Sequence, residues 1–196
     1  SGFAPARAED AAFRLVMLGD SLTSGYGLDR EEALPAQLEA ALAASGVTAE
    51  VVNAGVAGDT TAGGRARFDW ATGDDADAVL IALGGNDLLR GLDPAITEEN
   101  LEAMIVRAQE QDLPVFLAGM RAPTNWGEAY RAAFDGLYPS LAEKHDLAFF
   151  PFLLNGVAGS PALNQPDGIH PNPEGVAIIV DGLAPAIADF IQALTE

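Results

Sequence analysis

The chain has 196 residues, of which 29 are acidic and 10 are basic, so that its formal net charge is −19. This length predicts one domain with a sizeable core, and a composition of 49% hydrophobic and 20% charged residues is typical of a globular protein. Such an acidic chain is not expected to bind nucleic acid or anionic membranes, because both require clustered Lys and Arg. The lack of cysteine excludes disulfides, thiolate nucleophiles and Cys-ligated metals.

Residues 1–12 are expected to be a leader, followed by a single domain at residues 13–196. Ala6-Arg7-Ala8 fits the small-x-small pattern that precedes a signal-peptidase cut, although a charged n-region and an apolar h-region are missing. Two interpretations stay open: the remnant of a signal peptide of a periplasmic or secreted protein, or an Ala-rich leader of a cytoplasmic one. No apolar run approaches the roughly 20 residues of a membrane span, so no stable membrane insertion is expected.

Short apolar runs alternate with stretches of helical periodicity along the remaining chain. The runs predict strands at residues 13–18, 48–52, 78–83, 115–120 and 147–150. The periodic stretches predict helices at residues 34–44, from Thr60 toward Trp70, and at residues 94–110, 128–145 and 176–194, with a loop at 151–173. This alternation predicts an α/β fold, a three-layer sandwich around a parallel sheet. In such a sheet the ligand site lies in the loops beyond the carboxyl ends of the strands.

Four of these loops carry residues suited to chemistry. A glycine-rich turn at residues 19–27 presents Ser21, and Gly58 precedes a helix start, where backbone N–H groups can bind an anion. Asn86 offers a side-chain amide after the third strand. Asp167 lies three residues before His170, a spacing at which a carboxylate reaches one imidazole nitrogen and leaves the other free. Taken alone, the Ser21 turn is at least as well explained by ordinary capping chemistry, and the turns of Gly58 and Asn86 are better explained by ordinary turn chemistry, but the four loops together indicate an active site.

The histidines and a set of apolar residues also bear on the kind of site that is expected. The other of the two histidines, His145, lies at a polar helix end and is expected to be solvated. With two histidines and no cysteine a zinc site is not expected, and neither a metal nor a cofactor is predicted. Five apolar residues either line an acyl groove or belong to the core: Leu88, Leu89, Leu92, Trp126 and Phe152.

Four blocks match, in order, those of the SGNH (GDSL-type) hydrolases: GDSLTSGYG at 19–27, AGDT at 57–60, GGND at 84–87 and DGIHP at 167–171. The resemblance covers the chain from about residue 13 to the C-terminal helix. With MRAPTNWG at 120–127, the sequence resembles in particular the bacterial multifunctional acyl-CoA thioesterase, arylesterase and lysophospholipase subgroup. Ser24 departs from that subgroup, which often has Ala there. The resemblance implies a flavodoxin-like α/β/α sandwich with a five-stranded parallel sheet.

The resemblance also implies residue roles. Ser21 is the nucleophile and its N–H serves the oxyanion hole together with the N–H of Gly58 and the side chain of Asn86. His170 is the base, and Asp167 orients it. The implied substrates are small-molecule esters and thioesters cleaved through an acyl-enzyme: short to medium acyl esters, aryl esters, acyl thioesters or lysophospholipids. The alternatives are a carbohydrate O-acetylesterase on the same site and a non-catalytic α/β module that binds a small ligand. The oligomeric state cannot be read from the sequence.

Overall fold

The computed structural model describes residues 12–196. The expected leader lies almost wholly outside the described residues, so both interpretations of Ala6-Arg7-Ala8 stay predictions. Five parallel strands form one sheet in the order β2-β1-β3-β4-β5. They are β1 (Phe13–Gly19), β2 (Ala49–Gly55), β3 (Ala78–Ala82), β4 (Val115–Ala118) and β5 (Ala148–Phe150). The expected five-stranded sheet is confirmed, and its strand order is that of flavodoxin-like folds.

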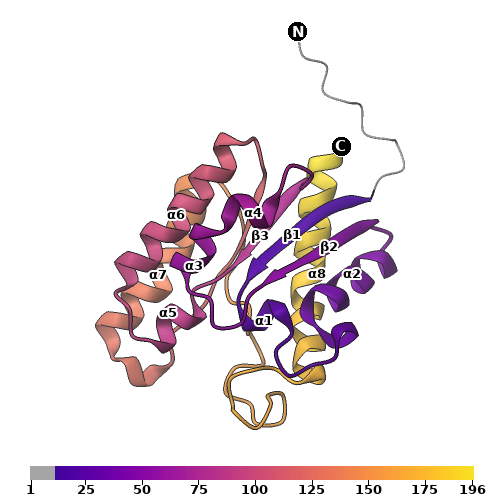
Figure 1. Ribbon diagram of the computed structural model, residues 1–196. Helices are drawn as coiled ribbons and strands as arrows, with labels where there is room; N and C mark the ends of the chain where they lie inside the picture. The colour runs from indigo at the N-terminus through magenta and orange to yellow at the C-terminus, as the bar shows by residue number, and fades with distance from the viewer. Residues whose placement is uncertain (1–11) are drawn as a thin grey trace.

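Helices cover both faces of the sheet, which makes the fold the expected three-layer sandwich (Figure 1). One face carries α2 (Leu34–Ala44) and α8 (Pro173–Thr195), which pack against each other. The other face carries α3 (Thr61–Ala66), α4 (Phe68–Thr72), α5 (Gly85–Leu89), α6 (Pro94–Glu110) and α7 (Glu128–His145). The loops contain the short α1 (Ser21–Ser24) and two 3-10 turns, η1 (Arg30–Glu32) and η2 (Thr124–Trp126).

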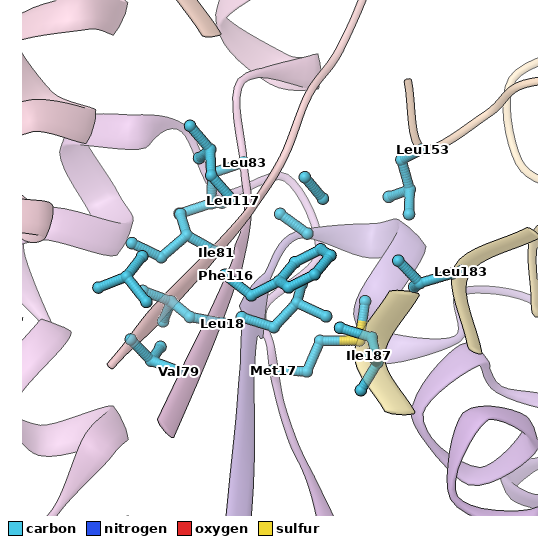
Figure 2. Packing of buried hydrophobic residues seen from close by; sticks show 14 of the residues in the cluster. Met17, Leu18, Val79, Ile81, Leu83, Phe116, Leu117, Leu153, Leu183 and Ile187 are labelled. Carbon is cyan, nitrogen blue, oxygen red and sulfur yellow. The ribbon is translucent and has the colours of Figure 1, made fainter. Parts of the chain in front are cut away.

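The central strands β1, β3 and β4 are largely buried and apolar on both faces because helices cover the sheet on both sides. Side chains alternate between the faces, so Met17 points toward Leu183 and Ile187 of α8, whereas Leu18 points to the opposite face with Ile81 (Figure 2). All five side chains are fully buried. Since burying one such side chain contributes about 1.5–3 kcal/mol, the core holds the carboxyl ends of the strands in fixed positions.

Two of the expected helix and strand boundaries on either side of Gly58 were wrong. The segment from Thr60 toward Trp70 forms two helices, α3 and α4, because the backbone leaves helical geometry at Arg67 (φ −112°, ψ 10°). Strand β2 runs to Gly55, three residues past its expected end, because it pairs with β1 as far as Gly19. The loop that contains Gly58 is therefore shorter than expected and is bounded closely by β2 and α3.

Helix α8 is also longer than the expected helix at residues 176–194. It begins at Pro173, and Asn172 caps it by accepting a hydrogen bond from the N–H of Gly175. By length and composition alone α8 is long and apolar enough to cross a membrane, so the observation that no apolar run approaches this length was wrong, whereas the expectation of no stable membrane insertion stays a prediction. Its buried residues recur at helical spacing, and the helix packs on α2 and β5. This is the pattern of an apolar helix face that covers a sheet.

The connections change direction between β1 and β3. The chain passes from β1 to β2 at one edge and then crosses back to β3 on the other side of β1. In open α/β sheets, ligands bind at such a switch point, beyond the carboxyl ends of the strands. Ser21 lies just after the end of β1 and Asn86 lies in the turn that follows β3, so the fold places both at the switch point.

Candidate active site

Ser21 is the first residue of α1 and is separated from β1 only by Asp20. Asp20 caps this short helix, since its Oδ1 accepts a hydrogen bond from the N–H of Leu22 at 3.0 Å. The first N–H groups of a helix have no partner within it, and the N–H of Ser21 donates no hydrogen bond within residues 12–196. The turn thus presents a hydroxyl and a free N–H from the same residue.

His170 joins Ser21 to Asp167. Its Nε2 lies 2.9 Å from Ser21 Oγ, and its Nδ1 lies 2.6 Å from Asp167 Oδ2. Hydrogen bonds from the backbone N–H and the ring of His170, and from the N–H of Ile169, lower the pKa of Asp167 to about 2. An ionised carboxylate only accepts hydrogen bonds, so Nδ1 carries the ring proton. Nε2 is then free to accept the hydrogen of the Ser21 hydroxyl.

The loop that carries His170 is tied to the loop that carries Ser21. Gln165 Nε2 donates to the carbonyl oxygen of Tyr26 at 2.7 Å and to that of Pro171 at 3.0 Å. The Gln165 N–H donates to the carbonyl of His170 at 2.7 Å, and the ring of Tyr26 packs on the imidazole with 4.5 Å between centroids. These contacts hold the imidazole in one place relative to Ser21, although the two residues are far apart in the sequence.

Asn86 lies at the start of α5, on the opposite side of the switch point. Its Nδ2 donates a hydrogen bond to Asp20 Oδ2 at 3.2 Å. An amide nitrogen carries two hydrogens, so this bond fixes the orientation of the amide and leaves one N–H for a ligand. Asp20 is only 2% exposed, and burial raises its pKa to about 6 although the hydrogen bonds from Leu22 and Asn86 lower it.

Gly58 lies in the turn between β2 and α3 with φ +81°, a backbone region that favours glycine. Its N–H donates no hydrogen bond to any described residue, while its carbonyl accepts one from Arg90 Nη2 at 2.6 Å. The turn starts in close contact with α1, because a Cβ on Gly55 would lie 2.2 Å from the backbone nitrogen of Ser24. The segment with Gly58 is therefore seated directly beside the helix that begins at Ser21.

A pocket of about 510 Å³ adjoins Ser21, Asp20 and Asn86. This volume is within the range of small-molecule sites, about 300–1,000 Å³. Apolar side chains form most of its walls, among them Leu88, Leu89, Met120, Pro123, Phe152 and Ile169. Of the residues expected either in a groove or in the core, Leu88, Leu89 and Phe152 line the pocket. Leu92 and Trp126 do not, and Trp126 instead stacks on Tyr130.

His145 differs from the sequence expectation. Its side chain is only 12% exposed, and its Nε2 lies 2.8 Å from Glu102 Oε1 on the neighbouring helix α6. The carboxylate of Glu102 also pairs with Lys144 at the end of α7. His145 is therefore a structural contact between α6 and α7 rather than a solvated side chain. Within residues 12–196, no cluster of His, Asp and Glu has the arrangement of a metal site.

Comparison with known proteins decides what kind of protein has this site. Residues 17–178 match the model of the GDSL-like lipase/acylhydrolase family. The chain belongs to this family. Esterase TesA of Pseudomonas aeruginosa is 41% identical over 162 residues, which are 82% of this chain and 81% of that protein. Thioesterase 1/protease 1/lysophospholipase L1 of Escherichia coli K12 is 36% identical over 93% of this chain and 86% of that protein.

Solved structures of relatives agree with this assignment. The crystal structure of AlinE4, an SGNH-hydrolase family esterase, superposes with a TM-score of 0.78 at 44% identity, covering 93% of this chain and 98% of that one. Membership of the GDSL-like family, with relatives this similar, makes the chain a serine ester hydrolase of the SGNH type. The resemblance read from the four sequence blocks is thereby confirmed at the level of the family.

Sequence reasoning missed the residues that connect the candidate site. Asp20 stands next to Ser21 and was passed over, although its position directly before the short helix α1 is that of a helix cap. Asp87 was attributed to turn chemistry, yet its side chain is fully buried and hydrogen-bonded to Thr61. Gln165 and Arg67 carried no signal in the sequence, because their partners lie on other loops.

Proposed function

We propose that Ser21, His170 and Asp167 form the catalytic triad of this hydrolase, and that Ser21, Gly58 and Asn86 form its oxyanion hole. The observation that supports the triad most strongly is the continuous line of contacts from Asp167 through His170 to Ser21, at 2.6 Å and 2.9 Å. A serine hydroxyl is a weak nucleophile at neutral pH and requires a base within hydrogen-bond reach. The imidazole of His170 is within that reach.

In the proposed reaction Ser21 Oγ attacks the carbonyl carbon of the ester while His170 Nε2 takes the hydroxyl proton. The ionised Asp167 stabilises the imidazolium that forms. Collapse of the tetrahedral intermediate breaks the bond to the leaving alcohol or thiol, which receives the proton from Nε2. Water then attacks the acyl-enzyme with the same base, releasing the acid and restoring Ser21. Every step uses side chains of this chain, so EDTA should leave the rate unchanged.

The proposed oxyanion hole is supported by three N–H hydrogens that have no acceptor among the described residues. The N–H groups of Ser21 and Gly58 are unpaired among the described residues, and Asn86 has one amide hydrogen left beyond its bond to Asp20. Donors that are in place before the reaction stabilise the developing charge without reorganisation. Removing one such donor typically lowers kcat by about 10²–10³-fold.

For the substrate we propose short to medium acyl and aryl esters, with acyl thioesters or lysophospholipids as further members of the class. The apolar walls of the pocket beside Ser21 suit an acyl chain or an aromatic ring. The names of the relatives, esterase and thioesterase/lysophospholipase, agree with this range. A carbohydrate O-acetylesterase would need polar walls for a sugar, and a non-catalytic binding module would have no use for the contact between Asp167 and His170.

The test is a panel of p-nitrophenyl esters from acetyl to dodecanoyl, assayed with the wild type and with Ser21→Ala. The matched control is Ser24→Ala, which removes a hydroxyl from the same short helix without touching His170. Turnover should vanish in Ser21→Ala and persist in Ser24→Ala, and it should extend beyond the acetyl ester. Turnover of the acetyl ester alone would favour the carbohydrate O-acetylesterase. Full activity of Ser21→Ala would contradict the proposed nucleophile.

We also propose a periplasmic or secreted location, with the cytoplasm as the alternative. The support is the Ala6-Arg7-Ala8 pattern, which fits a signal-peptidase site. The test is fractionation of cells that express the gene from its natural start codon, with N-terminal sequencing of the product. Mature protein that begins at Glu9 in the exported fraction would support the proposal, and uncleaved protein confined to the cytoplasm would contradict it.

A further inference from the structure

The donors of the proposed oxyanion hole come from strands that are not neighbours. Gly58 follows β2 and Asn86 follows β3, and β1 lies between these two strands. The hydrogen bonds of the sheet therefore do not join the two donor segments directly. Three donors act together only if they converge on one oxygen atom, with each within about 2.7–3.1 Å of it. Some direct link between the segments is needed to hold this convergence.

A buried pair of side chains supplies such a link. Asp87 is adjacent to Asn86 in the chain, and Thr61 begins α3 three residues after Gly58. Asp87 Oδ2 accepts a hydrogen bond from the backbone N–H of Thr61 at 2.9 Å, and Asp87 Oδ1 accepts one from the Thr61 hydroxyl at 2.5 Å. Both side chains are fully buried. The two bonds connect one residue of each donor segment by both backbone and side chain.

Other buried groups fix the direction of these bonds. Asn100 Nδ2 donates to the Thr61 hydroxyl oxygen at 3.3 Å, so the single hydroxyl hydrogen of Thr61 is left to donate to Asp87. Thr97 Oγ1 donates to Asp87 Oδ1 at 3.4 Å. Both partners lie on α6, the helix that packs against α3. The carboxyl of Asp87 thus receives three donors in a fixed arrangement with no freedom to rotate.

Burial of an acidic side chain is costly unless its hydrogen bonds are satisfied. No Arg or Lys among the described residues pairs with Asp87, so the carboxyl rests on neutral donors alone. An apolar residue at this position would pack at lower cost but could not join the two segments. An apolar replacement would therefore lose the link between the segment of Asn86 and the segment of Gly58.

We infer that Asp87 and Thr61 are positioning residues that hold the N–H of Gly58 and the amide of Asn86 at the separation required to bind one oxyanion. This inference rests on the proposed function. Neither side chain lines the pocket or contacts Ser21, so both act through the donors beside them. The link complements Arg67, which joins Asp59, the residue after Gly58, to the ends of β1 and β2.

The test compares two substitutions of Thr61. Thr61→Val removes the hydroxyl but keeps the backbone N–H and the shape of the side chain, whereas Thr61→Ser keeps the hydroxyl. The control is Thr72→Val, because Thr72 is also buried but donates its hydroxyl only within α4. All three are assayed with p-nitrophenyl butyrate, and their unfolding by urea is measured. We expect Thr61→Val to lower kcat about tenfold or more with KM within twofold, since small misplacements of reacting groups are costly. Thr61→Ser and Thr72→Val should stay within about twofold of the wild type.

Combination with Asn86→Ala separates positioning from general destabilisation. If Thr61 acts through the donor pair, Thr61→Val should cost much less in the Asn86→Ala background than in the wild type. Equal losses in both backgrounds, or a Thr61→Val no slower than Thr72→Val, would overturn the inference while leaving the oxyanion hole intact. An Asn86→Ala variant at the wild-type rate would overturn the proposed role of Asn86 and this inference together, so the two failures give different results.

Discussion

At the scale of single residues, Asp20 shows how the environment changes the chemistry of a side chain. It accepts hydrogen bonds from Leu22 and from Asn86, but burial dominates and raises its pKa to about 6 from 3.8. Asp167, by contrast, is held in a loop of backbone donors that lower its pKa to about 2. The two carboxylic acids beside His170 are therefore shifted in opposite directions, and only Asp167 stays ionised throughout the mildly acidic range.

The raised pKa of Asp20 predicts how stability depends on pH. The neutral form favours the folded state, so its contribution is complete below pH 3.8 and is lost as the pH rises through 6. The loss is on the order of 3 kcal/mol. The Asp20→Asn variant has no ionising group at this position. Its free energy of unfolding should therefore rise relative to that of the wild type between pH 4 and 7. Urea unfolding at several pH values measures this gain, with Asp74→Asn at an exposed site as the control. A difference between variant and wild type that is independent of pH would contradict the shift.

At this scale the sequence indicated where the proposed reacting groups lie, but not the residues that surround them. Ser21 and Asn86 stand in short turns that follow apolar runs, where chain order alone indicates their location, whereas His170 stands in the long loop at 151–173. The hydrogen bond from Gln165 to Tyr26 spans 139 residues, and that from Thr61 to Asp87 spans 26. Such contacts depend on how loops pack on each other, and no local pattern of residues carries that information.

At the scale of elements, the break between α3 and α4 has a structural consequence for the turn that carries Gly58. Arg67 leaves helical geometry at this break, and its guanidinium contacts Asp59 Oδ2 at 2.7 Å and the carbonyls of Ala54 and Gly19, each at 2.9 Å. One side chain thus binds the ends of β1 and β2 and the turn that carries Gly58. A continuous helix from Thr60 onward, as expected from its periodicity, would not leave Arg67 in this position.

These contacts predict a large cost for Arg67→Ala. The substitution leaves two carbonyls and the mostly buried Asp59 without their donor, so unfolding free energy should fall by about 2–4 kcal/mol. Arg67→Lys should recover little, because a single ammonium lacks the planar fork of donors. Arg65→Ala is the control. Arg65 makes an exposed ion pair with Glu99 and one hydrogen bond to Asn100 Oδ1 at 3.2 Å, so losing both should cost about 1–1.5 kcal/mol, less than the loss at Arg67. Urea unfolding compares the three variants, and equal losses at positions 65 and 67 would contradict this account.

Strands β1, β3 and β4 were predictable because each is a largely buried apolar run between turn residues, and the edge strands β2 and β5 were recognised from shorter apolar runs. The short helices were not, since α1 has four residues and α5 has five. Helices of this length show no periodicity and are stable only through their caps and tertiary contacts. The end of β2 was missed because its last residues, Asn53 to Gly55, have no strand preference of their own. Their pairing with β1 decides their conformation.

At the scale of the whole molecule, charge is distributed unevenly. The net charge is −19, and five of the cationic residues described by the structure lie within ion-pair distance of carboxylates: Arg14, Arg65, Arg67, Arg107 and Lys144. Arg121 lines the pocket beside Ser21 and lies over the ring of Phe152, with no carboxylate partner among the described residues. The field around the molecule repels anions, while one wall of the pocket carries a positive charge.

This distribution predicts a salt effect on anionic substrates. Long-range repulsion should slow the approach of an acyl-CoA at low salt and should be screened as the Debye length falls from about 30 Å at 0.01 M to about 3 Å at 1 M. The kcat/KM for an acyl-CoA should therefore rise several-fold relative to that for a neutral thioester with the same acyl group. The measurement is the ratio of the two kcat/KM values across this salt range. A ratio that does not change would show that the surface charge does not influence access to the site.

The central claim is that Ser21 carries the acyl group during turnover. The most direct measurement is reaction of the native enzyme with a p-nitrophenyl alkylphosphonate, followed by peptide mapping by mass spectrometry. We expect one phosphonyl group per chain, on Ser21, with loss of esterase activity in proportion to labelling and no label on a folded Ser21→Ala variant. An enzyme that loses activity with the label on another residue, or that stays active when Ser21 is fully labelled, would contradict the account.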